Sequence, residues 1–203
     1  MHRSGSGFAS RAVFVLGILA PFACAIAGID VVTERYDDAR LGANLSETQL
    51  NTSNVGASAF GKLWSYTASG SVYAQPLYVH DLAIPGQGTH NVLYVATMND
   101  VLYAFDADSP GVAPDFLPLL SLDIASQVPG EFPACIPDIL GYNDNIIGNV
   151  GIESTPVIDR STNTIYLVAR TETSSTGACQ GSNPTFIQRL HALDMTTFEE
   201  RPG

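Results

Sequence analysis

The chain has 203 residues, of which 45% are hydrophobic and 14% charged, and this composition excludes an intrinsically disordered chain. Twenty acidic residues against nine basic ones give a formal charge of −11. Nucleic acid and anionic membrane surfaces are therefore not expected as partners, because both attract clustered lysine and arginine. The 18 glycines, 12 prolines, 8 tyrosines and 9 phenylalanines favour a turn-rich β protein over a helical bundle.

Residues 1–27 have the pattern of a secretory signal peptide. Arg3 and Arg11 precede an uncharged apolar run at residues 12–23, which is shorter than the about 20 apolar residues that a membrane span needs. Small-x-small sites suited to cleavage follow at residues 23–25 and 25–27, and an uncut N-terminal anchor is the alternative interpretation. We therefore predict export to the periplasm or the extracellular space, with no membrane span once the signal has been removed.

Two cysteines remain after this cleavage. Export places Cys135 and Cys179 in an oxidising compartment, where an even number of cysteines favours a disulfide over a metal site. His80, His90 and His191 are scattered, without the short spacings that a zinc site uses. We predict a Cys135–Cys179 disulfide and no metal site.

Short runs rich in Val, Ile, Tyr, Phe and Thr, bounded by turn residues, predict β-strands along the mature chain. These strands cover residues 63–68, 72–79, 91–97, 101–107, 154–159, 164–171 and 186–194. Residues 98–100 and 159–163 separate two pairs of strands at hairpin distance, which favours antiparallel pairing. One helical turn is expected at Ser46–Leu50, and long insertions are expected at residues 80–90 and 108–153.

The strand pattern repeats. Pro76 matches Pro156, Tyr94 matches Tyr166, and Ala104 with Asp106 matches Ala192 with Asp194, at spacings of 80, 72 and 88 residues. Each copy supplies three strands, and the segment that follows it can supply a fourth. A repeated four-stranded sheet that cannot bury both faces alone is the unit of a β-propeller. We predict an all-β fold in which residues 28–203 form a partial β-propeller of about two four-stranded antiparallel blades, with the long insertion at 108–153.

The runs VLYVATMNDVLYAFDAD and TIYLVARTE…QRLHALDMTT carry a family resemblance. The chain resembles the PQQ-repeat β-propellers of the quinoprotein alcohol dehydrogenase-like superfamily, whose repeat contains a strand of the form lyAlDa. Ala104, Asp106, Ala192 and Asp194 occupy the A and D positions of that strand. The stretch from Arg35 through Gly88 also resembles uncharacterised secreted bacterial members, and the matches together cover about residues 35–200.

Departures from the family pattern bear on function. The docking tryptophan is missing after Asp106, and the adjacent cysteines of the methanol-dehydrogenase branch are absent. The resemblance implies pyrroloquinoline quinone and Ca²⁺ only for a complete propeller, so no cofactor is expected for this chain and no catalytic residue is assigned. Glu153 is a weak candidate for cofactor binding, and an exposed position at a loop end is its alternative. Because Asp106 and Asp194 recur once per repeat, we expect them to bind the turn after their strand.

Three functions remain open from the sequence. The chain is a secreted propeller module of unknown activity and part of a longer chain, or the N-terminal part of a PQQ-dependent alcohol or sugar dehydrogenase, or an interaction scaffold at the cell envelope or outside the cell. The missing cysteine pair and the unplaced calcium ligands favour a binding or scaffold protein over an enzyme. Further propeller blades or a protein partner are expected at the open edge of the last blade.

Overall fold

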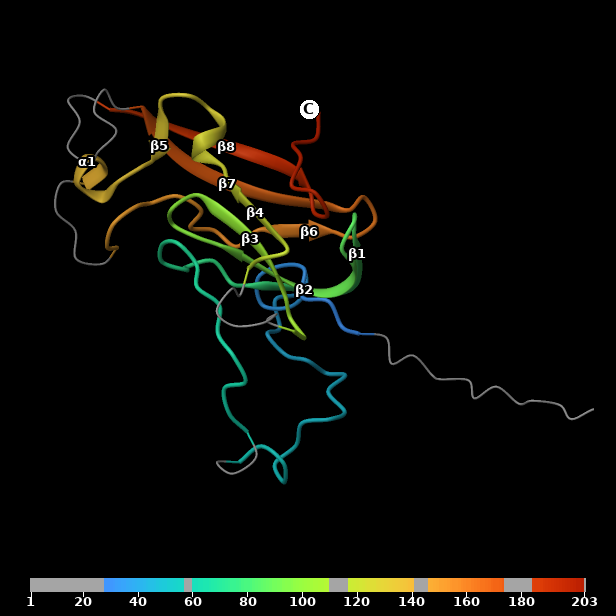
Figure 1. Cartoon of the computed structure of the whole chain (residues 1–203). Coiled ribbons are helices and arrows are strands. Elements are labelled where there is room, and N and C mark those ends of the chain that lie inside the picture. The colour runs from blue at the N-terminus through green and yellow to red at the C-terminus, as the bar shows by residue number, and fades with distance from the viewer. Residues whose placement is uncertain (1–27, 57–59, 110–116, 141–145, 174–183, 203) are drawn as a thin grey trace, which may run out of the picture.

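A computed structural model describes residues 28–56, 60–109, 117–140, 146–173 and 184–202. Within these ranges the regular structure consists of eight β-strands, one short α-helix and one 3-10 helix, and the strands form two antiparallel sheets of four strands each. The prediction of an all-β fold is confirmed. The two sheets are stacked. The sheet formed by strands within residues 131–194, called sheet 2, is drawn above the sheet formed by strands within residues 77–123, called sheet 1, in Figure 1. The predicted signal peptide at residues 1–27 lies outside the described residues.

Sheet 1 is a meander in which each strand pairs with the next. It contains β1 (Leu77–Ile84), β2 (Gly88–Ala96), β3 (Val101–Asp106) and β4 (Leu120–Asp123). The predicted hairpin turn between β2 and β3 is confirmed, and β4 is the expected fourth strand. The predicted insertion at residues 80–90 is wrong, because β1 and β2 continue through it to a tight turn. An irregular register between Val79 and Leu82 interrupts the alternation that the sequence analysis followed.

Sheet 2 is built around β7 (Thr164–Thr173), which pairs along its whole length with β8 (Thr185–Asp194). The other edge of β7 pairs with β6 (Val157–Asp159) near its start and with β5 (Glu131–Pro133) near its end. Beyond β8, an isolated bridge joins Leu193 to Glu200, in the place that a fourth consecutive strand would take.

The predicted insertion at residues 108–153 is partly regular. It contributes β4 and β5, and it contains the 3-10 helix η1 (Ala125–Gln127) and the helix α1 (Ile136–Leu140). No helix in the described part of the chain has the length and apolar character needed to cross a lipid bilayer.

Two local predictions near the N-terminus are wrong. Residues 63–68 do not form a strand, and Tyr66 instead packs against sheet 1, with its ring stacked on Phe105 at 4.3 Å between ring centres. The expected helical turn at Ser46–Leu50 is absent, because the Glu47 carboxylate accepts the backbone N–H groups of Gln49 (2.7 Å) and Leu50 (2.8 Å). Side chains that bind nearby backbone amides in this way compete with helix formation.

The main core lies between the two sheets. Sheet 1 contributes one face of alternating side chains, which we call its interface face: Leu77, Tyr94, Ala96, Leu102 and Ala104. Sheet 2 contributes its inner face: Ile158, Ile165, Leu167, Ala169 and Leu193. The buried Tyr94 hydroxyl donates a hydrogen bond across the core to the Met195 carbonyl oxygen at 2.7 Å. The opposite face of sheet 1 is partly covered by the N-terminal segment that carries Trp64 and Tyr66, and an open cavity of about 400 Å³ lies between this segment and the face.

The two sheets pair the repeated residues in the same register. In sheet 1, Tyr94 lies opposite Leu77 on one side and Ala104 on the other. In sheet 2, Tyr166 lies opposite Val157 and Ala192. These triplets are separated by the same 80, 72 and 88 residues that relate the sequence copies. The sequence repeat therefore corresponds to a structural repeat, with β1, β2 and β3 equivalent to β6, β7 and β8.

Candidate functional site

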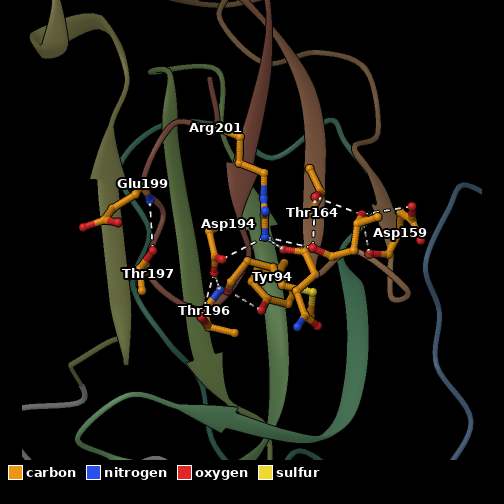
Figure 2. A network of polar contacts seen from close by, with 11 residues as sticks. Tyr94, Asp159, Thr164, Asp194, Thr196, Thr197, Glu199 and Arg201 are labelled. Atoms are coloured by element: carbon orange, nitrogen blue, oxygen red, sulfur yellow. Dashed lines mark hydrogen bonds and ion pairs between the residues drawn. The ribbon is translucent and has the colours of Figure 1, made fainter. Parts of the chain in front are cut away.

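The repeated aspartates stabilise turns. Asp106 Oδ1 accepts the backbone N–H groups of Asp108 (2.9 Å) and Ser109 (3.1 Å). Asp194 Oδ1 accepts the backbone N–H of Thr196 (2.8 Å) and its hydroxyl (2.7 Å), as Figure 2 shows. Burial raises the pKa of both carboxyl groups, but these hydrogen bonds outweigh it and the net pKa is lowered. The predicted architectural role of both residues is confirmed.

Arg201 connects the end of sheet 2 to the preceding hairpin, and the sequence analysis missed it. Its Nη2 donates to Asp194 Oδ2 at 2.9 Å and to the backbone carbonyl oxygens of Thr162 (2.8 Å) and Asn163 (3.2 Å). In Figure 2 the Arg201 side chain points from the C-terminal segment into this group of acceptors. The arrangement fixes the β6–β7 turn against the end of β8 and is structural.

The three histidines of the mature chain lie apart from one another, as their sequence spacing suggested. Each pairs through Nδ1 with a different carboxylate: His80 with Asp30 (2.6 Å), His90 with Asp106 (2.8 Å) and His191 with Glu200 (2.9 Å). Two hydrogen bonds raise the pKa of His90. The larger effect comes from the bond to the Gln87 carbonyl oxygen and the smaller from the bond to the Asp106 carboxylate. These pairs hold neighbouring segments together and do not form a common site.

Cys135 is buried beside the carboxylate of Glu172. Its backbone N–H donates to Glu172 Oε2 at 3.3 Å, and its Sγ lies 3.9 Å from Glu172 Oε1. Next to this pair, the buried Glu131 carboxylate accepts hydrogen bonds from Arg189 and Thr171, which together lower its pKa. Cys179 lies outside the described residues, so the Cys135–Cys179 disulfide stays a prediction.

Glu153 lines an open cavity of about 350 Å³ at the end of β7. The cavity is lined by Val150, Gly151, Glu153, Ser154, Val168, Arg170 and Gln188. The Arg170 guanidinium lies over the Phe186 ring at 5.4 Å, and it makes no ion pair with any other described residue. Its buried Nε has no hydrogen-bond acceptor among these residues.

This cavity does not fit a quinone held by calcium. Its described lining offers one carboxylate, that of Glu153, whereas Ca²⁺ takes 6–8 oxygen ligands. Elsewhere in the described ranges, no group of three or more His, Cys, Asp or Glu side chains is arranged to hold a metal ion. We therefore derive no chemical step through such a cofactor from these residues.

Asp100 is a buried acid in the β2–β3 turn that the sequence analysis treated only as a turn residue. It is fully buried, and neither carboxylate oxygen makes a hydrogen bond within the described structure. Burial, with a smaller contribution from the Asp123 carboxylate, raises the pKa of Asp100 to about 8. Gly151 lies against it so closely that a Cβ there would approach Asp100 Oδ1 to 2.5 Å.

The outer face of sheet 2, which points away from the core, is apolar and exposed. We define it by the side chains that share its register: Val157, Tyr166, Val168, Leu190 and Ala192. Val157 is 45% exposed, Tyr166 37% and Leu190 71%. Their equivalents in sheet 1, Leu77, Tyr94 and Leu102, are 0%, 1% and 0% exposed. Apolar side chains gathered on one exposed face are typical of interaction surfaces.

No family model, no curated protein and no solved structure matches this chain.

Proposed function

We propose that the chain is an exported scaffold module built from β-propeller-type blades, similar to the PQQ-repeat propellers, and that it acts by binding other proteins. In this proposal residues 1–27 direct export and are removed. The remaining chain supplies about two blades of a longer array and performs no chemistry by itself.

One observation carries the proposal: the two sheets repeat similar residues, some of them identical, at the same register. Leu77, Tyr94 and Ala104 are aligned across sheet 1 as Val157, Tyr166 and Ala192 are aligned across sheet 2. The sheets also pack face to face, so that the second buries a face that the first cannot bury alone. This mutual dependence of neighbouring units is the physical basis of repeat architectures.

The chemistry of the cavity supports binding over catalysis. Glu153, the candidate for cofactor binding, is exposed, and it lies beside Arg170, Gln188 and Ser154, with no second carboxylate among the described residues that line the cavity. The signal-like N-terminus favours a role outside the cytoplasm. Export is the part of the proposal that rests on sequence alone.

Three measurements test the proposal. Mass spectrometry of the periplasmic and culture fractions should find a mature N-terminus between Ile26 and Asp30, and an intact Met1 there would argue against export. Nuclear Overhauser contacts across Tyr94–Ala104 and across Tyr166–Ala192 should both appear in the exported protein. The absence of the second set would contradict the repeated register.

Titration of the exported protein with pyrroloquinoline quinone and Ca²⁺ should give neither tight binding nor dye reduction with alcohols or sugars. Glu153→Gln serves as the control, because a cofactor bound through this cavity should lose affinity in that variant. Tight binding with turnover, weakened by the substitution, would overturn the scaffold proposal in favour of a quinone-dependent dehydrogenase.

A further inference from the structure

We infer that the outer face of sheet 2 is a docking surface for one further antiparallel sheet of the same repeat type, presenting branched aliphatic and alanine side chains. This inference rests on the proposed function and names the partner that the module binds. The occupant is defined by the protein's own internal interface, in which an equivalent face is already covered.

The apolar part of the surface follows from the repeat. On sheet 1, Leu77, Ala96 and Leu102 are buried by the Ile, Leu and Ala side chains of the inner face of sheet 2. Their equivalents on sheet 2 are Val157, Val168 and Leu190, which keep both the apolar character and the register. A surface that preserves the pattern of a buried interface fits the same kind of covering sheet.

A polar contact sets the position of the partner sheet relative to sheet 2. Tyr94 spans the internal interface and donates its hydroxyl proton to the Met195 carbonyl oxygen, just after the end of β8. Tyr166 holds the equivalent position on the outer face, where its side chain is partly exposed. In the docked state Tyr166 donates to the backbone carbonyl that follows the third strand of the partner sheet.

Arg170 adds a charge requirement at the end of the same face. Arg170 lies on the same face of β7 as Tyr166 and Val168, because the three residues occupy every second position of the strand. Its guanidinium lacks an ion-pair partner within the described ranges. A partner sheet with an acidic side chain opposite this position forms an ion pair with the Arg170 guanidinium. A partner with a basic side chain there is disfavoured.

A second copy of this chain does not offer the matching face. The face of sheet 1 that carries Leu93, Val95 and Phe105 is partly covered by its own N-terminal segment: Tyr66 is stacked on Phe105, and an apolar cavity of about 400 Å³ lies beside this contact. The inner face of sheet 2 is covered by sheet 1. Self-association is therefore an outcome that the experiment must separate from docking of a further sheet.

The experiment supplies the partner by extending the full chain with a second copy of residues 154–203, which carries a second set of β6, β7 and β8. Hydroxyl-radical footprinting of the exported protein should show strong oxidation of Tyr166 and Leu190. In the extended chain, oxidation at both positions should fall to the level of their buried equivalents, Tyr94 and Leu102.

Leu190→Glu in the original sheet should restore oxidation of Tyr166 in the extended chain, because a charge then faces the docked sheet. The matched control is the same substitution at the equivalent leucine of the added copy, which should leave Tyr166 protected. Far-ultraviolet circular dichroism of the unextended Leu190→Glu variant should match that of the parent chain.

Two results would overturn the inference. In the first, Tyr166 stays fully oxidisable in the extended chain while the contacts across Tyr94–Ala104 and Tyr166–Ala192 remain intact. That result rejects the docking surface and leaves the scaffold proposal standing. In the second, the unextended chain forms a dimer in light-scattering measurements and Leu190→Glu dissociates it, which assigns the face to self-association.

Discussion

Sheets 1 and 2 carry similar residues at the same register, yet they differ in what covers those residues. Leu102 of sheet 1 is completely buried, whereas Leu190 at the equivalent position of sheet 2 is 71% exposed. The difference arises because sheet 2 covers the interface face of sheet 1, whereas Tyr166 and Leu190 on the outer face of sheet 2 stay exposed among the described residues. Register is thus a property of each sheet, and burial depends on the neighbouring sheet.

The comparison also separates structural roles from docking roles. Asp106 and Asp194 each accept the backbone N–H of the residue two positions further on, so their role needs no neighbouring sheet. Tyr94 and Tyr166 share a register position but only Tyr94 makes the buried contact to Met195. Positions of the first kind should respond alike to substitution in both sheets, and positions of the second kind should respond differently.

The largest difference between the two sheets in the effect of substitution on stability is expected at Asp100, whose equivalent in sheet 2 is the exposed Gln188. The carboxyl pKa is near 3.8 in the unfolded chain and about 8 in the folded one, so between these values the folded protein holds one more proton. The free energy of unfolding therefore falls as pH rises, by about 6 kcal/mol across the window. Asp100→Asn removes this decline, so its stability relative to the parent chain should increase from acid to alkaline pH.

Urea unfolding at several pH values measures this effect. The control is Glu153→Gln, which removes an exposed acid and should follow the pH dependence of the parent chain. An Asp100→Asn variant with the same pH dependence as the parent would contradict the assigned burial of the Asp100 carboxylate.

Leucine truncation tests the comparison at the sheet interface. Leu102→Ala should lower the free energy of unfolding by about 2–5 kcal/mol, because it leaves a cavity between the sheets. Leu190→Ala should change it by no more than about 0.5 kcal/mol in the unextended chain. Chemical denaturation of both variants gives the two values, and equal losses would show that the outer face of sheet 2 is covered.

The tyrosine pair gives a smaller contrast. Tyr94→Phe removes the hydroxyl that binds the Met195 carbonyl and should cost about 1–2 kcal/mol, because that oxygen stays buried without its donor. Tyr166→Phe should be close to neutral. The measurement is thermal or urea unfolding near neutral pH, and a large effect of Tyr166→Phe would mean that its hydroxyl is already engaged in the isolated chain.

The repeated aspartates should give the smallest contrast. Asp106→Ala and Asp194→Ala should each lower the free energy of unfolding by about 1 kcal/mol, since each loses hydrogen bonds within a turn. The pKa of each carboxyl is lowered in the folded state, so this contribution is present at neutral pH and is lost as pH falls through the folded pKa. Denaturation at neutral and acid pH tests both points, and a loss confined to one sheet would break the equivalence.

The sequence predicted the strands whose side chains alternate without interruption. Residues 91–97, 101–107 and 164–171 correspond closely to β2, β3 and β7, and the two hairpin turns between strands were also predicted. The extension of β1 was missed because its register is irregular between Val79 and Leu82. β5 was missed because it is three residues long, and its partner residues on β7 follow it by about 40 positions.

Less of the candidate site than of the fold could be predicted from the sequence. Glu153 was identified, but Arg170 and Gln188 share its cavity only because β7 extends past β6 and pairs with β8 along its whole length. Asp100 carries an ordinary turn signature, and its burial is created by Gly151, which follows it by 51 positions. Such contacts between distant segments leave no local signal in composition or periodicity.

The connectivity of the two sheets also predicts the order in which they form during folding. Sheet 1 pairs each strand with its neighbour in the chain, and the β1–β2 and β2–β3 connections are tight turns, so closing them costs little entropy. Sheet 2 gathers β5 from far upstream, and the Tyr94–Met195 contact joins residues 101 positions apart. Because non-local pairing is slow, sheet 1 forms first and its interface face then serves as the surface on which sheet 2 condenses. Substitutions in β2 and β3 should therefore slow folding, while those in β8 should mainly accelerate unfolding.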